Sequence, residues 1–271
     1  MSIFECVKNM TQQLLRGVLF MVRGLYIAGT GMLLQRRRME TITNNIVNAE
    51  TTAYKKEFNI SHSFDEVLTR RINDNPTVRQ GRIVGPLNLG TQVDQLYLDF
   101  TQGALETTER STDLALIGDA FFVVQTPEGE RYTKTGHFYI NDGGFLTDVD
   151  GNLLLGSNGP INVGGIDFAV DSSGNVFNAD GYIDTIRVVS FADNETLRRQ
   201  GSNLYYSTEP PLAEANPYSI AQGFLESSNI DIGREMVDML AMFRTYETNQ
   251  RMMTMIDETL GRAVNDIGRL R

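Results

Sequence analysis

The sequence has little of the side chains that most catalytic and metal sites use. Its 271 residues include one cysteine, Cys6, and two histidines, His62 and His137. One cysteine can form neither an internal disulfide nor a cysteine zinc site, and two histidines leave little for histidine metal chemistry. The motifs G-x-S-x-G and H-E-x-x-H and a phosphate-loop motif are also missing. We therefore expect no catalytic residue, no metal, no cofactor and no small-molecule substrate.

Long apolar runs and tryptophan are missing as well. The best apolar stretch, Leu14–Val22, is interrupted by Arg16 and Gly17, so the sequence predicts no membrane-spanning helix. Apolar residues still make up 41% of the chain and charged residues 21%, which is enough to bury a core. The chain has 25 glycines and only 7 prolines, a composition that suits many tight turns. Its length predicts one large domain or two modest ones.

The net charge of −10 argues against a general nucleic-acid binder, which needs a basic surface. The charge is unevenly distributed along the chain. Residues 21–56 hold six Lys and Arg against two Glu, whereas residues 57–228 hold ten basic against 24 acidic residues. This asymmetry suggests that the ends make contacts and that an acidic middle supplies solubility.

An apolar repeat of seven predicts a helix over residues 24–50. Leu25, Met32, Met39 and Ile46 are seven apart, and Ala28 begins a second row three residues later. Such spacing makes a coiled-coil or bundle seam plausible. The run Arg36–Arg38 inside this segment is most simply a solvated face.

The C-terminal segment has a stronger helical pattern. Asn229 and Asp231 are candidate N-caps, and a helix of about 38 residues would be about 57 Å long. That length is too great for the core of a small domain, so the helix needs a partner. Spacings of three and four, with consecutive threes that resemble a stammer, connect Met236, Met239, Phe243, Tyr246, Gln250, Met253, Ile256, Leu260, Ala263 and Ile267.

Between these helices the apolar pattern changes to short β-rich runs. Turn dipeptides such as Asp142-Gly143, Asp150-Gly151 and Asp180-Gly181 separate them, and this is the strongest short-range hairpin signal. The expected strands are Phe121–Val124, Tyr132–Ile140, Asn152–Leu155, Ile161–Val170 and Ile183–Phe191. The predicted fold class is α+β, with long N- and C-terminal helices that pair as a coiled coil and an antiparallel β-rich domain between them.

The pattern changes divide the chain into five parts. Residues 1–20 are expected to be a non-native or disordered leader, because regular patterning starts at Met21 and no proper secretion signal precedes it. A translation start assigned 20 residues too early would explain this segment. The other parts are an N-terminal helix with an Asn-rich motif (21–56), an irregular connector (57–84), a β-rich outer domain (85–220) and a C-terminal helix (221–271).

Residues 148–152, with the sequence DVDGN, admit two interpretations. Alternating oxygen ligands resemble a calcium loop, but an EF-hand needs glycine at position 6 and glutamate at position 12. Here the glycine comes at position 4, and position 12 is Gly159. We therefore favour a hairpin turn. His137 lies in an alternating run and is expected to be a strand residue, not a base.

Two further motifs flank the β-rich part. The first is NNIVNAETTAYK over residues 44–55, which places Asn44, Asn45 and Asn48 beside the seam residue Ile46. The second is GFLESSNID over residues 223–231, directly before the long helix. Both can be local capping sequences. Carboxamides beside a buried seam can also fix the register between packed helices, and we expect the three Asn to act between subunits.

Together these motifs resemble the rod and hook family of axial proteins in the bacterial flagellum. The first motif is similar to the family signature NNIAN followed by T-x-G-Y-K, with departures at Val47 and at Ala53, where glycine is usual. The second is similar to G-x-L-E-x-S-N-V-D, and residues 112–122 resemble the motif of the family's central β domain. Because only glycine takes a positive φ freely, Ala53 puts the local turn in doubt.

The resemblance implies a structural subunit of the basal-body rod, the tubular drive shaft that carries torque from motor to hook across the periplasm. It implies terminal helices in an inner tube, a β domain outside, and partners that are copies of the chain, other rod proteins and the flagellar export apparatus. The residues expected at the assembly interface are Leu25, Met32, Met39, Asn44, Asn45, Ile46, Asn48, Tyr54, Glu226, Asn229, Met236, Phe243, Tyr246, Asn249, Met253 and Leu260.

Two choices stay open on the sequence. The stretches 36–40 and 63–68 favour the proximal rod member of the family, with the distal rod member as the alternative. A secreted β-rich binding module with a coiled-coil stalk, such as a calcium-dependent adhesin, is the competing class of function. An enzyme is the third and weakest hypothesis of function.

Overall fold

The computed structural model describes residues 3–70, 83–88, 90–201, 203–212 and 215–268. The chain divides into two compact units. Unit 1 comprises Met1–Thr43, Phe58–Leu96 and Gly233–Arg271, and unit 2 comprises Asn44–Glu57 and Tyr97–Ile232. Neither helix in the described part of the chain is long and apolar enough to cross a membrane.

Unit 1 is built from two long helices and two small sheets. Helix α1 begins at Ile3, well before the expected start near residue 24, and ends at Val47, while helix α2 covers Ile232–Gly268. Whether residues 1–20 are dispensable stays a prediction. The strands are β1 (Glu57–Ser63), β2 (Val67–Arg70), β3 (Ile83–Leu87) and β4 (Thr91–Leu98), paired as β1 with β4 and β2 with β3.

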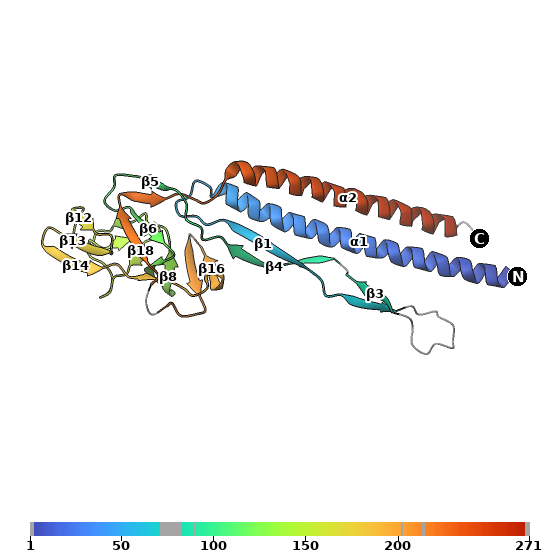
Figure 1. The fold of residues 1–271 in the computed structure, drawn as a ribbon. Helices are drawn as coiled ribbons and strands as arrows, with labels where there is room; N and C mark the ends of the chain where they lie inside the picture. Colours follow the sequence, from blue (N-terminus) through green and yellow to red (C-terminus); the bar gives the residue numbers. More distant parts are fainter. Residues whose placement is uncertain (1–2, 71–82, 89, 202, 213–214, 269–271) are drawn as a thin grey trace. The chain divides into compact units, whose positions relative to one another are not determined.

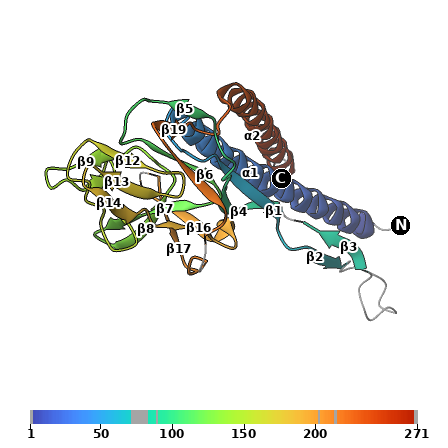
Figure 2. The same cartoon turned by 60° about the vertical axis from the view of Figure 1, so that its left-hand side comes forward.

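The two helices lie side by side and run antiparallel (Figures 1 and 2). A Cβ on Gly24 would lie 3.1 Å from Ile256 Cδ1, and a Cβ on Gly31 would lie 3.0 Å from Asn249 Nδ2. From the first of these contacts to the second, the position on α1 advances by seven residues while the position on α2 goes back by seven, as antiparallel helices require. Missing side chains at these two glycines let the helices approach closely.

The expectation of an irregular connector over residues 57–84 is wrong, because strands β1 and β2 lie within this range. The alternation of β1 is inverted, because Phe58 and Ile60 are exposed. The polar side chains between them contact α1: Asn59 donates to Thr41 Oγ1 at 2.6 Å, and Ser61 accepts from Arg38 at 2.9 Å. A strand that docks through polar side chains shows no apolar inner face in its sequence.

Unit 2 is an antiparallel β domain. Its main sheet has eight strands in the order β16-β17-β8-β7-β11-β10-β9, with β15 also on β7, and a three-stranded sheet has the order β12-β13-β14. The pairs β18-β6 and β19-β5 complete it. Their bounds are β5 Leu105–Thr107, β6 Leu114–Gly118, β7 Phe121–Thr126, β8 Gly129–Thr133, β9 Tyr139–Ile140, β10 Leu146–Thr147, β11 Leu153–Leu154, β12 Phe168–Val170, β13 Asn175–Asn178, β14 Gly181–Thr185, β15 Val188–Val189, β16 Leu197–Gln200, β17 Leu204–Ser207, β18 Tyr218–Gln222 and β19 Phe224–Glu226, with a short 3-10 helix at Asn194–Thr196.

Strand β7 organises the core of unit 2. Phe122 and Val124 on one face belong to the larger apolar cluster, whereas Phe121 and Val123 on the other face belong to a second cluster. All four side chains are fully buried. A strand covered on both faces is apolar at consecutive positions, which explains the unbroken FFVV run.

The predicted turn dipeptides join neighbouring antiparallel strands. Glu128-Gly129 lies between β7 and β8, Asp142-Gly143 between β9 and β10, and Asp150-Gly151 between β10 and β11. The expected strand Tyr132–Ile140 is wrong as one element, because β8 ends at Thr133 and β9 begins at Tyr139. Ile161–Val170 likewise holds strand structure only from Phe168 onward.

The DVDGN segment is a turn that uses its own aspartate. Asp148 Oδ1 accepts from the backbone N–H groups of Asp150 and Asn152, and Oδ2 accepts from the Asn152 amide. Asp171 makes the same three bonds to Ser173 and Asn175. Internal hydrogen bonds lower the pKa of the Asp171 carboxyl, chiefly the one from the Asn175 side chain. Asp148 thus closes the turn with both of its oxygens, as the hairpin interpretation predicts.

Ala53 takes the backbone conformation that the family's glycine would take. Its φ is +53°, in the left-handed region, and its side chain is 1% exposed. The Ala53 N–H donates to the Glu226 carbonyl at 2.8 Å, which fixes the peptide in this strained form. A Cβ in the left-handed region costs roughly 1–2 kcal/mol. The turn is therefore kept despite the departure from glycine.

We predict that Ala53→Gly leaves the stability of unit 2 within about 0.5 kcal/mol of the parent, because relief of this strain offsets the extra chain entropy of glycine and the loss of a buried methyl group. Denaturant unfolding of purified monomer measures the change. Ala49→Gly is the matched control: Ala49 lies in the same turn region without a positive φ, so this variant should be less stable than the parent. Equal losses in the two variants would contradict a strained Ala53.

Candidate assembly site

One face of helix α2 is covered by other parts of the chain. Nine of its covered or half-covered residues follow alternating spacings of four and three, the spacing of a heptad seam, while Asp238 and Glu247 are half-covered outside this row. Glu235 at its start is 2% exposed. The covered or half-covered residues of this face, called the α2 seam below, are Glu235, Met239, Met242, Tyr246, Asn249, Met253, Ile256, Leu260 and Ala263.

The α2 seam differs at two positions from the row of apolar residues that the sequence predicted. Met236 and Phe243 are 52% and 50% exposed and lie outside it, and Met242 and Asn249 take the places given to Phe243 and Gln250. With these replacements the spacing is regular and no stammer is needed. The prediction chose the wrong residues because α2 carries two rows of apolar residues on neighbouring faces, and one continuous pattern can be drawn through both rows.

Met236, Leu240 and Phe243 form a second apolar stripe on α2, beside the seam. Their spacing of four and three puts them on one helix face, and each is at least half exposed. The exposed apolar residues of the two helices also include Val237, Met252, Met255 and Val264 on α2 and Tyr26, Ile27 and Leu33 on α1. Exposed apolar surface gathered on one element marks an interaction site.

The expected seam residues of α1 lie at positions that unit 1 partly covers. Leu25, Met32 and Met39 are half-buried, and Ala28 between them is 4% exposed. These positions agree with a seam on α1. Ile46, at the end of the helix, belongs to unit 2 and is half-buried there.

Asn45 acts within the chain, which corrects its expected role between subunits. Its side chain is fully buried, its Nδ2 donates to the Glu57 carbonyl at 2.9 Å, and its Oδ1 accepts from the Glu57 N–H at 3.0 Å. One carboxamide thus satisfies both backbone groups of a residue at the start of β1. This geometry ties the end of α1 to the strand that follows.

Asn44 and Asn48 are placed differently. Asn44 is exposed, and half-buried Asn48 donates to the Asn44 carbonyl at 2.8 Å, as a residue past a helix C-terminus does. This hydrogen bond does not prevent Asn44 or Asn48 from contacting a further partner. A role between subunits remains a prediction for these two residues.

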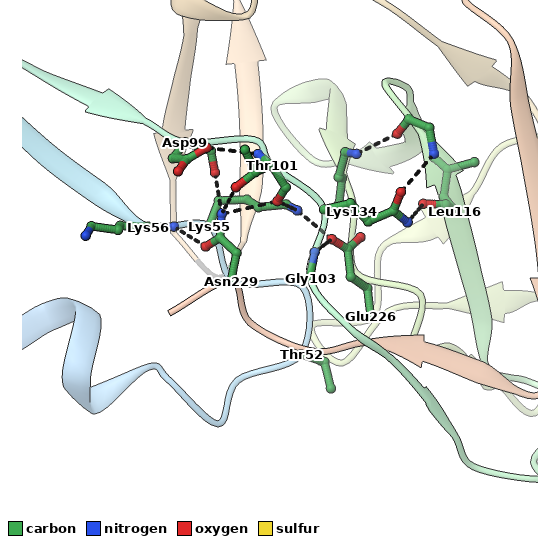
Figure 3. Close-up of polar contacts among 12 residues, drawn as sticks. Thr52, Lys55, Lys56, Asp99, Thr101, Gly103, Leu116, Lys134, Glu226 and Asn229 are labelled. Carbon is green, nitrogen blue, oxygen red and sulfur yellow. Dashed lines mark hydrogen bonds and ion pairs between the residues drawn. The ribbon is translucent and has the colours of Figure 1, made fainter. Parts of the chain in front are cut away.

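The two sequence motifs meet in unit 2 at a buried ion pair (Figure 3). Lys55 Nζ lies 2.5 Å from Glu226 Oε1, and the two side chains are 0% and 1% exposed. Lys55 also donates to the Thr101 carbonyl at 2.8 Å, and the Gly103 N–H donates to Glu226 Oε1 at 2.8 Å. Both charges are therefore hydrogen-bonded, as burial requires, although the buried Glu226 Oε2 has no partner among the described residues.

Asn229 joins the same two motifs a second time. Its Oδ1 accepts from the Lys56 N–H, and its Nδ2 donates to the Asp99 carbonyl, both at 2.8 Å (Figure 3). The expected assembly residues Glu226 and Asn229 thus have contacts inside the subunit. These internal contacts are enough to explain why the two positions are Glu and Asn, without a role at an interface.

A buried lysine that the motifs did not indicate lies near this pair. Lys134 is 2% exposed, and its Nζ donates to the Gly118 carbonyl at 2.8 Å (Figure 3). Burial, together with the nearby Lys55 charge, lowers its pKa to about 8, while the Glu226 carboxylate opposes the shift. A lysine inside the expected strand Tyr132–Ile140 gave no sequence signal of burial.

Tyr54 completes the first motif as a buried residue beside a cleft. The Arg199 guanidinium lies 4.0 Å above its ring, and Arg199 Nη1 is paired with Glu57 at 2.7 Å. Burial raises the pKa of the Tyr54 hydroxyl. A cleft of about 400 Å³ borders these residues within unit 2, with Asn48, Thr52, Asp148 and Asn203 in its wall.

We predict that Asn45→Ala lowers the stability of the isolated subunit by about 1–3 kcal/mol, because two buried backbone groups of Glu57 lose their partner. Asn44→Ala is the matched control, since Asn44 is exposed, and should stay within about 0.5 kcal/mol of the parent. Thermal unfolding of both variants measures the difference. An Asn45 variant as stable as the control would show that the carboxamide has no internal role.

Lys134 predicts a pH dependence of stability. Its folded pKa of about 8 lies below the unfolded value of 10.5, so between these pH values the unfolded chain binds more protons and stability rises with pH. The rise is on the order of 3 kcal/mol. We expect Lys134→Met to flatten it, whereas Lys56→Met should keep it. Urea unfolding at pH 7 to 10.5 is the measurement, and an unchanged slope in Lys134→Met would contradict the assignment.

Models of three protein families match the chain in order. Residues 25–55 match the flagella basal body rod protein model, and residues 115–184 match the D1 domain of the flagellar hook proteins FlgE, FlgF and FlgG. Residues 221–266 match the C-terminal model of the flagellar basal body rod FlgEFG proteins. The first and last ranges contain the two motifs that meet at Lys55 and Glu226.

Relatives match along most of their length. The flagellar hook-basal body complex protein FlhO of Bacillus subtilis is 33% identical over 92% of this chain and 100% of that protein. FlgG of the same organism is 30% identical over 90% and 99%. FlgF of Mesorhizobium japonicum is 24% identical over 90% and 97%. The chain belongs to the flagellar basal-body rod family of FlgE, FlgF and FlgG, whose members are structural proteins of the basal body and not enzymes.

Proposed function

We propose that this chain is an axial subunit that polymerises into the basal-body rod, with the second apolar stripe of α2 at the contact between subunits. Met236, Leu240 and Phe243 carry the proposal, because they stay exposed after α2 has packed in unit 1. A contact between different patches on successive copies does not close on itself and generates a filament. The occupant of the stripe is a neighbouring subunit of the rod.

The pairing of α1 and α2 as a coiled coil is part of this proposal. The regular spacing of the α2 seam and the close approaches at Gly24 and Gly31 support it. A paired stalk presents the stripe on a stiff element, which a shaft under torque requires. Asn249 in the seam, beside Gly31, gives a polar residue that can fix the register of the pair.

The position in the rod is proposed as distal and FlgG-like, with a proximal, FlgF-like position as the alternative. Residues 36–40 and 63–68 favoured the proximal member. The relatives support the distal one, because FlgG of Bacillus subtilis is 30% identical and FlgF of Mesorhizobium japonicum is 24% identical over similar shares of the chain. We infer further that the chain leaves the cell through the flagellar export apparatus and assembles with other rod proteins across the periplasm.

We predict that Met236→Asp with Phe243→Asp prevents rod assembly and motility, since each buried, unpaired carboxylate at a subunit contact costs several kcal/mol. The monomer should melt within a few degrees of the parent, because both side chains are already about half exposed. Rod length in electron micrographs of basal bodies, swimming in soft agar and monomer melting are measured on the same strains.

Two controls separate the stripe from general effects of charge. Thr245→Asp with Thr248→Asp adds the same charge to exposed positions on another face of α2 and should leave rods normal. Met253→Asp places a charge in the seam and should lower monomer stability as well. Normal rods in the stripe variant would overturn the proposal.

A further inference from the structure

Three side chains of unit 2 form a hydrogen-bonded chain at the edge of the main sheet. Asp113 Oδ1 lies 2.7 Å from His137 Nδ1, and His137 Nε2 lies 2.6 Å from the Tyr139 hydroxyl. His137 and Tyr139 are two residues apart, so their side chains leave the same side of the strand. Strand β9, which begins at Tyr139, is the last strand in the order of this sheet.

Asp113 holds the imidazole from inside the domain. Asp113 is 1% exposed, and its Oδ2 has no hydrogen-bond partner among the described residues. Its backbone is fixed, because its N–H donates to the Arg110 carbonyl and its carbonyl accepts from the Gly223 N–H. A buried carboxylate at Nδ1 retains the proton there, which leaves Nε2 as the acceptor that faces Tyr139.

Tyr139 is open to solvent at the other end of the chain. Its side chain is 40% exposed, and the Arg110 guanidinium lies 5.7 Å from its ring centroid. A nucleophile bonded to a base, with the base oriented by a third group, is the arrangement that activates hydroxyl side chains.

We propose that Tyr139 is a base-activated phenol and a site of covalent modification by acyl donors of the activated-ester class. Tyr139 Oη attacks the carbonyl carbon of the ester and forms a new C–O bond, while His137 Nε2 takes the phenol proton. The leaving alkoxide or phenolate departs when its bond to the carbonyl carbon breaks, and the imidazolium gives the proton to the oxygen of this leaving group. Asp113 stabilises the imidazolium. The product is one O-acyl tyrosine per subunit.

The chain contains its own comparison for this reactivity. Tyr182 is more exposed, at 56%, but its hydroxyl bonds Thr185 Oγ1 at 2.8 Å, and Thr185 is no base. If exposure alone sets the rate of acylation, Tyr182 reacts faster than Tyr139. If the Asp113–His137 pair sets it, Tyr139 reacts faster despite being less exposed.

The test treats the full-length protein with p-nitrophenyl acetate at neutral pH and quantifies acetylated peptides by mass spectrometry over time. We expect Tyr139 to be acetylated at least tenfold faster than Tyr182, since a positioned base typically supplies about 10²–10⁴-fold. His137→Ala and Asp113→Asn should remove this ratio, whereas His62→Ala, which changes the other histidine, should leave it intact.

Added imidazole distinguishes a base from a structural support. In His137→Ala it should restore acetylation at Tyr139 more than at Tyr182, because the truncated side chain leaves room for it beside the hydroxyl. Circular dichroism checks that each variant is folded. Equal rates at Tyr139 and Tyr182 in the parent protein would overturn the proposal. So would a ratio that survives His137→Ala in folded protein.

Discussion

The ion pair between Lys55 and Glu226 is the contact on which the centre of the subunit depends. Both side chains are withdrawn from water, and such burial costs several kcal/mol per ion unless each charge is bonded on several sides. Thr101 and Gly103 supply those additional bonds. Removal of either partner would leave an uncompensated charge in the domain, so each of the two sequence motifs depends on the other for a stable subunit.

This pair gives the motifs a role that differs from the one expected of them. Asn45, Ala53 and Lys55 in the first motif and Glu226 and Asn229 in the second all bond within unit 2. They stabilise the connection from α1 to β1 and the connection from β19 to α2. The motifs thus build the subunit, and the exposed stripe of α2 is left as the surface for its neighbours.

Local chemistry made much of the fold predictable. The Asp-Gly turns join the strands they were expected to join, because a positive φ and an aspartate cap are properties of a few adjacent residues. The β-rich middle and the two terminal helices followed from apolar periodicity. Ala53 put the local turn in doubt, but the turn is kept, because Ala53 adopts a φ of +53°.

Features that depend on distant partners were not predictable. Phe58 and Ile60 point away from α1 while polar neighbours contact it, so β1 lacked a readable apolar face. On α2 two apolar stripes overlap in sequence, and only packing shows that Met242 belongs to the seam and Phe243 does not. Asp113, His137 and Tyr139 come together across a gap of more than twenty residues, and Lys134 is buried by strands elsewhere in the chain.

Hydrogen–deuterium exchange on monomer and on assembled rods tests the division between motifs and stripe most directly. The account predicts that backbone amides of residues 53–57 and 226–229 are equally protected in both states, because their contacts are internal to the subunit. Amides of residues 236–243 should gain protection only in the rod. Fast exchange of the amides of residues 53–57 in the monomer, with protection appearing on assembly, would contradict the account. It would indicate that the motifs lie at the interface between subunits.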